Sequence, residues 1–200
     1  MRIIAGRLRG LQLADVGEGD AAAHLRPTTD RVREAIFNLL VNAHGDPATG
    51  APVTGARVLD LFAGTGALGL EALSRGAARV TFVEDGIKGR ALIRQNVEKM
   101  RAQGQIDLYR RDATRMGPNR GAPFDLVFLD PPYGLGLGEK ALASALEGGW
   151  IAPGAMVVWE EAAPVPPVPG LAPFDQRRYG DTVVTLLRAA GGQAGPQAGG

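Results

Sequence analysis

The chain has 200 residues, of which 45% are hydrophobic and 22% are charged, a composition typical of one soluble globular domain. It has no cysteine and two histidines far apart in sequence, which excludes disulfides, a cysteine nucleophile and thiolate metal sites and argues against a histidine metal site. No apolar run reaches the roughly 18 residues of a membrane-spanning helix. We therefore expect a monomeric cytoplasmic protein without metal, whose chemistry depends on carboxylates, backbone groups and a bound cofactor.

The first residues form a basic stretch that is predicted to be a hairpin. Residues 2–13 read as two short strands, and they carry Arg2, Arg7 and Arg9 without any acid. A second basic stretch, residues 101–120, carries five arginines against two aspartates. The net charge of the chain is only +1, but such local patches can bind phosphates. The alternative is that these arginines are scattered over the surface and keep the protein soluble.

A helix is predicted after this arm and a flexible loop. The apolar positions follow helical spacing at Val32, Ala35, Ile36, Leu39 and Leu40. Thr28 or Thr29 can cap its N-terminus, and Asp30 in the first turn suits the helix dipole. Residues 44–55 are rich in turn formers, so we interpret residues 1–55 as an N-terminal extension.

From residue 56 onward, strands and helices alternate. Strands are predicted at residues 57–62, 79–84, 105–110, 124–130 and 155–160, and helices at 67–75, 87–103 and 139–147. A short helical stretch is expected after the third strand. Residues 176–187 read as an antiparallel hairpin around Gly180-Asp181, after an irregular proline-rich connection.

This pattern predicts an α/β fold with a doubly wound, mostly parallel sheet of seven strands that ends in the antiparallel hairpin. The sheet and its helices would occupy residues 56–188. The Gly- and Ala-rich tail, residues 189–200, is predicted to be disordered.

A glycine-rich turn follows the first of these strands. Gly64, Gly66 and Gly69 let the backbone bend sharply and let a ligand approach closely, and the next helix offers free N–H groups there. Ligands of open α/β sheets bind at the carboxyl ends of the strands. We therefore predict a cofactor site that includes the turn residues Phe62, Ala63, Gly64, Thr65 and Gly66.

Two cofactors compete for this turn. The spacing of Gly64, Gly66 and Gly69 also satisfies the dinucleotide fingerprint, with Glu84 at the distance of a ribose-binding acid, so an oxidoreductase is one alternative. Asp60, however, stands inside the strand end, where a dinucleotide fold usually has an apolar residue. An acid there suits the positively charged amino and sulfonium groups of S-adenosylmethionine.

Acids recur at the ends of the next two strands. Glu84 can accept both ribose hydroxyls, and Asp112 can accept from an adenine amino group, with Ala113 beside it. Each acid alone would more often be a solvated loop residue. Their recurrence at successive strand ends favours a shared pocket.

The motif Asp130-Pro131-Pro132-Tyr133 follows an apolar strand and predicts the reaction. The two prolines fix φ and lack N–H groups, so the carbonyls are held stiffly outward. Asp130 and the Pro131 carbonyl can each accept one N–H of an exocyclic amine, and the Tyr133 ring can stack on a base. These bonds favour a pyramidal nitrogen whose lone pair faces a methyl donor. A plain strand-to-loop turn is the alternative.

With these residues in place, the chain resembles class I S-adenosylmethionine-dependent methyltransferases that modify amino groups. More narrowly, it resembles the bacterial small-subunit (16S) ribosomal RNA guanine-N2 methyltransferases of the family designated D. The matching segments are residues 2–6, 9–10, 26–34, 59–76, 130–133 and 179–182. The motif Asp130-Pro131-Pro132-Tyr133 alone is shared with DNA adenine methyltransferases, and segment 26–34 is the more specific part.

The resemblance implies S-adenosylmethionine as cofactor and one guanine of small-subunit rRNA, naked or in a 30S assembly particle, as substrate. It implies an N-terminal hairpin that holds RNA, to which we add Arg26 and Arg31. It places Thr28 and Thr29 near the methionine end of the cofactor. One departure is Gly86, which stands after the acids where the family tends to have a side chain.

Two further hypotheses stay open. A DNA adenine-N6 methyltransferase would usually need a separate target-recognition region, for which 200 residues leave little room. A non-catalytic RNA chaperone or assembly factor could retain the cofactor pocket, but it would not need the intact motif at residues 130–133.

Overall fold

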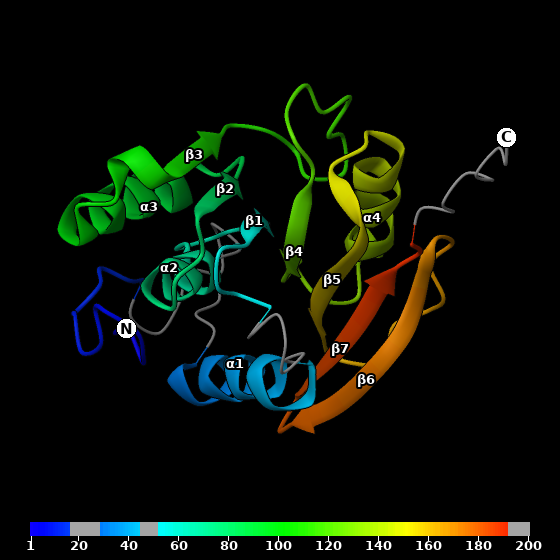
Figure 1. Ribbon diagram of the computed structural model, residues 1–200, viewed down its shortest axis with the longest axis horizontal. Helices are drawn as coiled ribbons and strands as arrows, with labels where there is room; N and C mark the ends of the chain where they lie inside the picture. The colour runs from blue at the N-terminus through cyan, green and yellow to red at the C-terminus, as the bar shows by residue number, and fades with distance from the viewer. Residues whose placement is uncertain (17–28, 45–51, 192–200) are drawn as a thin grey trace, which may run out of the picture.

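The computed structural model describes residues 1–16, 29–44 and 52–191. These residues form one seven-stranded sheet with helices on its faces (Figure 1). In chain order the elements are α1 (Asp30–His44), β1 (Arg57–Leu61), α2 (Ala67–Ser74), β2 (Arg79–Val83), α3 (Ile87–Met100), the 3-10 turn η2 (Gln103–Gln105), β3 (Ile106–Tyr109), β4 (Phe124–Leu129), α4 (Leu137–Glu147), β5 (Ile151–Glu161), β6 (Leu171–Tyr179) and β7 (Thr182–Ala189).

The strand order is β3-β2-β1-β4-β5-β7-β6. Strands β3 to β5 pair in parallel, whereas β7 runs antiparallel to both β5 and β6. This confirms the predicted doubly wound sheet and its terminal hairpin. The chain leaves β1 toward β2 on one side and returns to β4 on the other, so the carboxyl ends of β1 and β4 form the switch point where such folds bind ligands.

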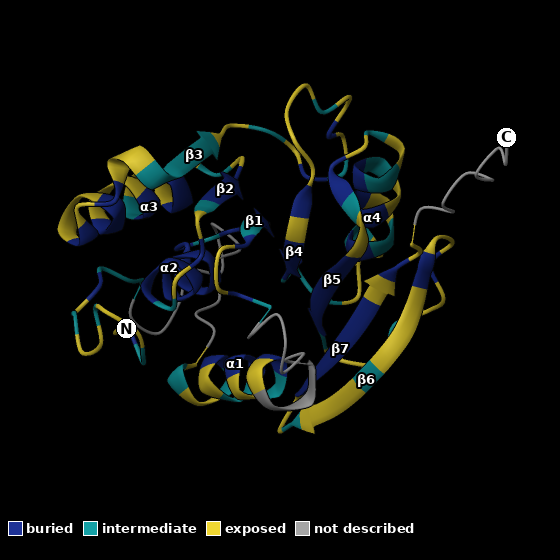
Figure 2. Ribbon diagram, in the orientation of Figure 1, coloured by how far each residue is buried: buried dark blue, intermediate teal, exposed yellow. Residues whose placement is uncertain are grey.

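Alternate residues of the strands feed two hydrophobic clusters, one on each face of the sheet. Val58 and Phe128 join α1, α2 and α3 on one face, whereas Leu59 and Leu129 join α4 on the other. Figure 2 shows the central strands buried and β6 exposed along most of its length. The residue that follows each parallel strand therefore lies at the edge of a sheet whose central strands are buried and tightly packed.

The N-terminal arm differs from the predicted two-stranded hairpin. Residues 2–13 contain a single antiparallel bridge, between Arg2 and Gln12, in place of two strands. Gly6 and Gly10 have φ values of +81° and +87°, so the chain coils between them instead of extending. A Cβ at Gly6 would lie 1.9 Å from the Ser74 carbonyl oxygen, which shows how closely the arm packs against α2.

A buried carboxylate anchors the arm. Glu71 of α2 is fully buried and accepts hydrogen bonds from the N–H groups of Ile4 and Ala5, at 2.8 and 3.0 Å. Its carboxylate also pairs with Arg75 at 2.7 Å and with Arg33 of α1 at 3.8 Å. Ile3 and Leu13 of the arm lie in the same core as the sheet. The described part of the extension is thus packed into the core on the α2 face of the sheet rather than tethered beside it.

Three other predictions differ from the structure. The expected helical stretch after β3 is wrong, because residues 110–123 form an irregular loop interrupted by Gly117, Pro118 and Gly121. Strands β5 and β6 are longer than predicted. Of the tail predicted to be disordered, Ala189 ends β7, and residues 192–200 lie outside the described part of the chain.

Candidate active site

The glycine turn after β1 is tightly closed. Phe62 adopts φ +57° and Gly64 φ +54°, and the Gly66 N–H bonds the Ala63 carbonyl at 2.7 Å. A Cβ at Gly69 would lie 2.4 Å from the Phe82 ring, so this glycine lets α2 pack directly on β2. The turn therefore presents backbone groups and the Phe62 side chain at the carboxyl end of the sheet.

Glu84 is fixed in this turn by two backbone groups. One of its carboxylate oxygens accepts from the Gly64 N–H and the other from the Gly86 N–H, both at 2.7 Å. Built Cβ atoms at Gly86 and Gly89 would lie within 2.9 Å of the Glu84 side chain, so both glycines make room for it. Each oxygen keeps a second lone pair. A rigid pair of acceptors like this fits the two hydroxyls of a ribose.

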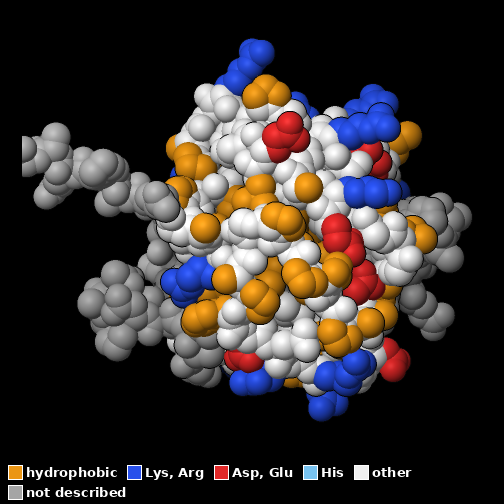
Figure 3. Space-filling model, turned by 90° about the vertical axis from the view of Figure 1, so that its right-hand side faces the viewer, with side chains coloured by type: hydrophobic (Ala, Val, Ile, Leu, Met, Phe, Trp, Pro, Cys, Tyr) orange, Lys and Arg blue, Asp and Glu red, His pale blue; other side chains and the backbone are white. Residues whose placement is uncertain are grey.

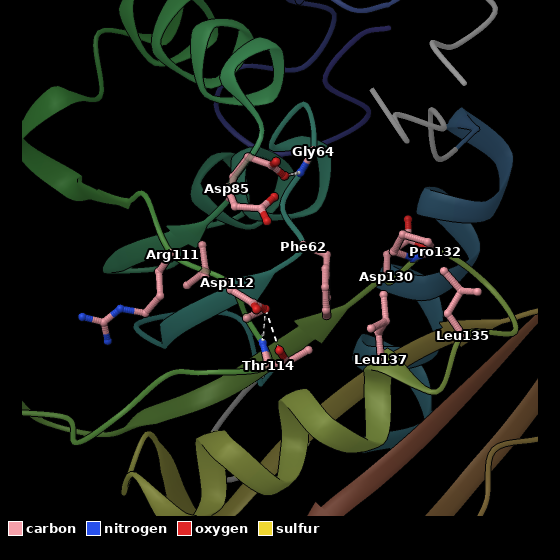
Figure 4. A pocket seen from close by; sticks show the side chains of 13 residues that line it. Phe62, Gly64, Asp85, Arg111, Asp112, Thr114, Asp130, Pro132, Leu135 and Leu137 are labelled. Atoms are coloured by element: carbon pink, nitrogen blue, oxygen red, sulfur yellow. Dashed lines mark hydrogen bonds between the residues drawn. The ribbon is translucent and has the colours of Figure 1, made fainter. Parts of the chain in front are cut away.

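A pocket of about 350 Å³ opens beside Glu84 (Figure 4). It lies among the carboxyl ends of β1, β2, β3 and β4, and its volume is in the range of small-molecule sites. Its walls are formed by Phe62, Gly64, Val83, Glu84, Asp85, Arg111, Asp112, Ala113, Thr114, Asp130, Pro132, Leu135 and Leu137. The predicted residues Phe62, Gly64, Glu84, Asp112, Ala113, Asp130 and Pro132 are thus brought together.

Asp112 is held as an acceptor on one side of the pocket. Its Oδ1 accepts from both the N–H and the hydroxyl of Thr114, at 2.8 and 2.7 Å. The hydroxyl bond, followed by the backbone bond, lowers the pKa of Asp112 despite some burial. The side chain is therefore ionised at neutral pH and can accept from an amino group of a bound purine.

Asp130 and Pro132 lie on the opposite side of Phe62 from Asp112 (Figure 4). They follow β4, and Leu135 and Leu137 continue the same wall. The pocket thus has a polar end at β2 and β3 and an end at β4 that combines a carboxylate with apolar side chains. Such a division suits a cofactor whose adenosine lies at one end and whose reactive group faces an acceptor at the other.

Asp60 lies below this pocket and does not line it. Its carboxylate is 3% exposed and accepts from the Gly69 N–H at 2.9 Å, which caps the first turn of α2 from within the sheet. Burial raises the pKa of Asp60 well above its usual value, and the charges of Asp130 and Glu84 add to this rise. A cationic ligand beside these three carboxylates would relieve their repulsion.

The remaining predicted residues are placed as follows. Ala63, Thr65 and Gly66 belong to the turn but do not line this pocket, and neither do Pro131 and Tyr133. Thr29 caps α1, accepting from the Val32 N–H at 3.3 Å, while Thr28 and Arg26 lie outside the described residues. The pocket residues that were not predicted are Val83, Asp85, Arg111, Thr114, Leu135 and Leu137.

Tyr133 has a partner that the sequence did not suggest. Its hydroxyl lies 3.3 Å from the hydroxyl of Thr182, the first residue of β7. Thr182 is buried and directly follows the turn that joins β6 and β7. The contact ties the loop after β4 to the terminal hairpin, so the Tyr133 hydroxyl orients its ring.

We expect Tyr133→Phe and Thr182→Val each to lower methyl-transfer efficiency several-fold, since a neutral hydrogen bond contributes roughly 0.5–1.5 kcal/mol. Because both changes remove the same bond, the double variant should be no worse than either single one. Thr182→Ser should restore activity. Steady-state kinetics of the four variants tests this, and additive losses in the double variant would show that the two hydroxyls act separately.

The described residues hold neither a metal-binding cluster nor a membrane-spanning helix. Residues 1–16, 29–44 and 52–191 contain no group of three or more His, Asp or Glu side chains placed to hold a metal ion. None of the helices in these ranges is both long and apolar enough to span a membrane.

The sheet order, the glycine turn, the acids at successive strand ends and the motif at residues 130–133 define a class I S-adenosylmethionine-dependent methyltransferase. The chain belongs to the family described as conserved hypothetical protein 95, which matches residues 1–188. Relatives of this chain are named as methyltransferases, which decides against the oxidoreductase alternative.

Curated relatives and solved structures agree with this family. The chain is 41% identical over 162 residues to ribosomal RNA small subunit methyltransferase D of Escherichia coli K12, covering 80% of this chain and 74% of that protein. It is 39% identical over 136 residues to the putative rRNA methyltransferase YlbH of Bacillus subtilis, covering 66% and 67%. The structure of the putative methyltransferase yhhF from Escherichia coli superposes with a TM-score of 0.77 and 32% identity, covering 96% and 99%.

Proposed function

We propose that the protein transfers a methyl group from S-adenosylmethionine to the exocyclic N2 amine of one guanine in small-subunit rRNA. The observation that carries this proposal is that Asp130 and Pro132 line the same pocket as Glu84. A hydroxyl-binding carboxylate and an amine-binding motif therefore share one cavity. The names of the relatives, several of them small-subunit rRNA methyltransferases, supply the class of nucleic acid.

The residues of this chain can position both reactants. When bound, S-adenosylmethionine supplies an electrophilic methyl group. Glu84 would hold the ribose and Asp112 the adenine amine, from opposite sides of the polar end. At the other end, Asp130 and the Pro131 carbonyl would accept the two N–H groups of the target amine, which directs the nitrogen lone pair toward the methyl group. Phe62, between the two ends, and Leu137, at the Asp130 end, are apolar lining residues that would help to keep water from the reacting groups.

The motif at residues 130–133 would also bind the amine of an adenine in DNA. The experiment therefore has to test directly which class of nucleic acid is the substrate. Purified protein is incubated with methyl-labelled S-adenosylmethionine and either naked 16S rRNA, 30S particles, 23S rRNA or duplex DNA. We expect label in 16S rRNA, naked or in the particle, and not in 23S rRNA or DNA. Label in DNA alone would overturn the proposed substrate.

We also propose that the N-terminal arm contacts RNA. Arg2, Arg7 and Arg9 are exposed, although Arg7 bonds Gln105 at 2.9 Å and Arg2 pairs with Asp30 at 3.4 Å. Arg31 is exposed at the start of α1. Deleting the arm would leave the buried Glu71 without its backbone donors, so side-chain substitutions are the sharper test.

We expect Arg2→Ala/Arg7→Ala/Arg9→Ala to weaken RNA binding while cofactor affinity stays the same. Each lost phosphate contact should reduce the slope of log affinity against log salt by about 0.7 on single strands, so the triple variant should lose up to about 2. Filter binding of 16S rRNA at several salt concentrations measures this slope. An unchanged slope would mean that the arginines are only surface charges.

A further inference from the structure

The irregular loop after β3 encloses a groove that the proposed reaction does not use. The groove measures about 740 Å³ and lies where the sequence had predicted a helix. Four arginines line it together with three aromatic rings, and we call it the arginine groove: Arg57, Arg111, Arg115 and Arg120, with Tyr109, Phe124 and Trp150. Asn119 adds an amide to the same wall.

Charge is concentrated in this groove. Among the described residues that line it, the one acid is Asp107, which Arg79 neutralises through two hydrogen bonds of 2.7 and 2.8 Å. Four arginines therefore face one paired carboxylate, in a chain whose net charge is +1. The charge distribution differs on the face shown in Figure 3. Apolar side chains occupy the centre of that face, and basic groups are scattered around them.

The floor of the arginine groove is rigid. Phe124 and Trp150 are 3% exposed and stack with ring centroids 6.0 Å apart. The Arg57 guanidinium lies 5.1 Å from the Phe124 ring, and that of Arg111 lies 5.7 Å from the Trp150 ring. Hydrogen bonds hold the loop, since the Trp150 indole donates to the Gly117 carbonyl at 2.7 Å and the Asn119 N–H donates to the Gly148 carbonyl at 2.8 Å.

The rim, by contrast, carries groups that can reach a ligand. The side chain of Arg115 is 87% exposed, and Arg120 is also exposed. Tyr109 is 38% exposed and presents the one large exposed ring among the described groove residues. Flexible cations around an exposed aromatic ring are the arrangement with which proteins bind single-stranded nucleic acid.

The arginine groove adjoins the cofactor pocket at one residue. Arg111 lines both cavities, and in Figure 4 its guanidinium points away from the pocket. We propose that the arginine groove binds the phosphodiester backbone of a segment of the substrate RNA that flanks the target nucleotide, with Tyr109 stacking on an unpaired base. This inference rests on the proposed function and extends it by naming a second RNA-binding surface, separate from the N-terminal arm.

The test compares two pairs of substitutions that remove equal charge. Arg115→Ala/Arg120→Ala changes the groove, whereas Arg94→Ala/Lys99→Ala changes exposed residues of α3 on another face. The probes are a fluorescent 20-nucleotide single-stranded RNA for binding and naked 16S rRNA for methylation. If two phosphate contacts are lost, the groove variant should show a salt slope lower by about 1.4 and, at 0.1 M salt, roughly 25-fold weaker RNA binding.

Methylation kinetics should separate binding from chemistry. The groove variant should raise KM for 16S rRNA and leave kcat unchanged, while the α3 variant should match the wild type. Arg115 lies 4.0 Å from Asp112, but its side chain is 87% exposed and such an exposed pair contributes little, so cofactor affinity should change at most slightly. Equal RNA affinity and salt slope in the two variants would overturn the inference. If the wild type methylates no rRNA, the proposed function fails, and the 20-nucleotide probe still decides whether the groove binds RNA.

Discussion

Replacing Asp130 by alanine is expected to lower the methyl-transfer rate by about 100-fold or more, the usual loss when one preorganised contact to the reacting group is removed. Asp130 lines the pocket at the end of β4 and, in the proposed mechanism, accepts an N–H bond that strengthens as the amine becomes pyramidal. Cofactor affinity should change little, because Asp112 lies on the far side of Phe62 from Asp130 and Glu84 is held separately by the Gly64 and Gly86 N–H groups. Single-turnover kinetics at saturating cofactor measures the rate.

Two controls accompany this variant. Asp130→Asn retains an acceptor oxygen without the charge, so its rate should fall between those of the wild type and the alanine variant. The charge of Asp130 raises the pKa of Asp60, so its removal relieves repulsion in the apo protein and should not lower the melting temperature through that interaction. Full activity in Asp130→Ala would contradict the mechanism.

Replacing Glu84 by alanine is expected to weaken S-adenosylmethionine binding by about tenfold or more, because each hydrogen bond to a charged group contributes roughly 1.5–3 kcal/mol. Glutamine should be nearly as damaging. Both carboxylate oxygens already accept N–H bonds, from Gly64 and Gly86, so an amide NH2 would face a donor on one side. Calorimetry measures the affinity, and unchanged binding in either variant would remove Glu84 from the site.

The same residue predicts a pH dependence. Burial raises the pKa of Glu84, and its two backbone bonds offset this only in part. The protonated side chain loses acceptor capacity, so cofactor affinity should fall as pH is lowered through this raised pKa. The fall should begin at a higher pH than an ordinary glutamate would give, and the Glu84→Ala variant should lack it.

The fold was predictable because its signals are local. From Arg57 onward, short apolar runs alternate with segments whose apolar residues have helical spacing. Strands that alternate with helices in this way pair in parallel. The full length of β5 was not predictable, because Pro153 and Gly154 interrupt its pattern and the pairing with β4 shifts register there. Strand β6 lacks an alternating pattern because it is an edge strand exposed on most of its residues.

The sequence could predict which residues gather at the candidate site, but not which hydrogen-bond partners they have. Acids at the ends of parallel strands must meet at one edge, so Glu84, Asp112 and Asp130 could be grouped from sequence. The bonds from Asp60 to Gly69 and from Tyr133 to Thr182 depend on packing between distant segments. Leu135 and Leu137 gave no signal, since an apolar residue in a loop or at the start of a helix does not reveal which cavity it lines.

The most direct test of the central claim is the identity of the modified nucleoside. Naked 16S rRNA is methylated in vitro by the wild type and by Asp130→Ala, digested to nucleosides and analysed by mass spectrometry. Our account predicts N2-methylguanosine at about one per rRNA molecule with the wild type, and little or none with the variant. N6-methyladenosine as the product, or N2-methylguanosine in equal amount and at an equal rate from both proteins, would contradict it.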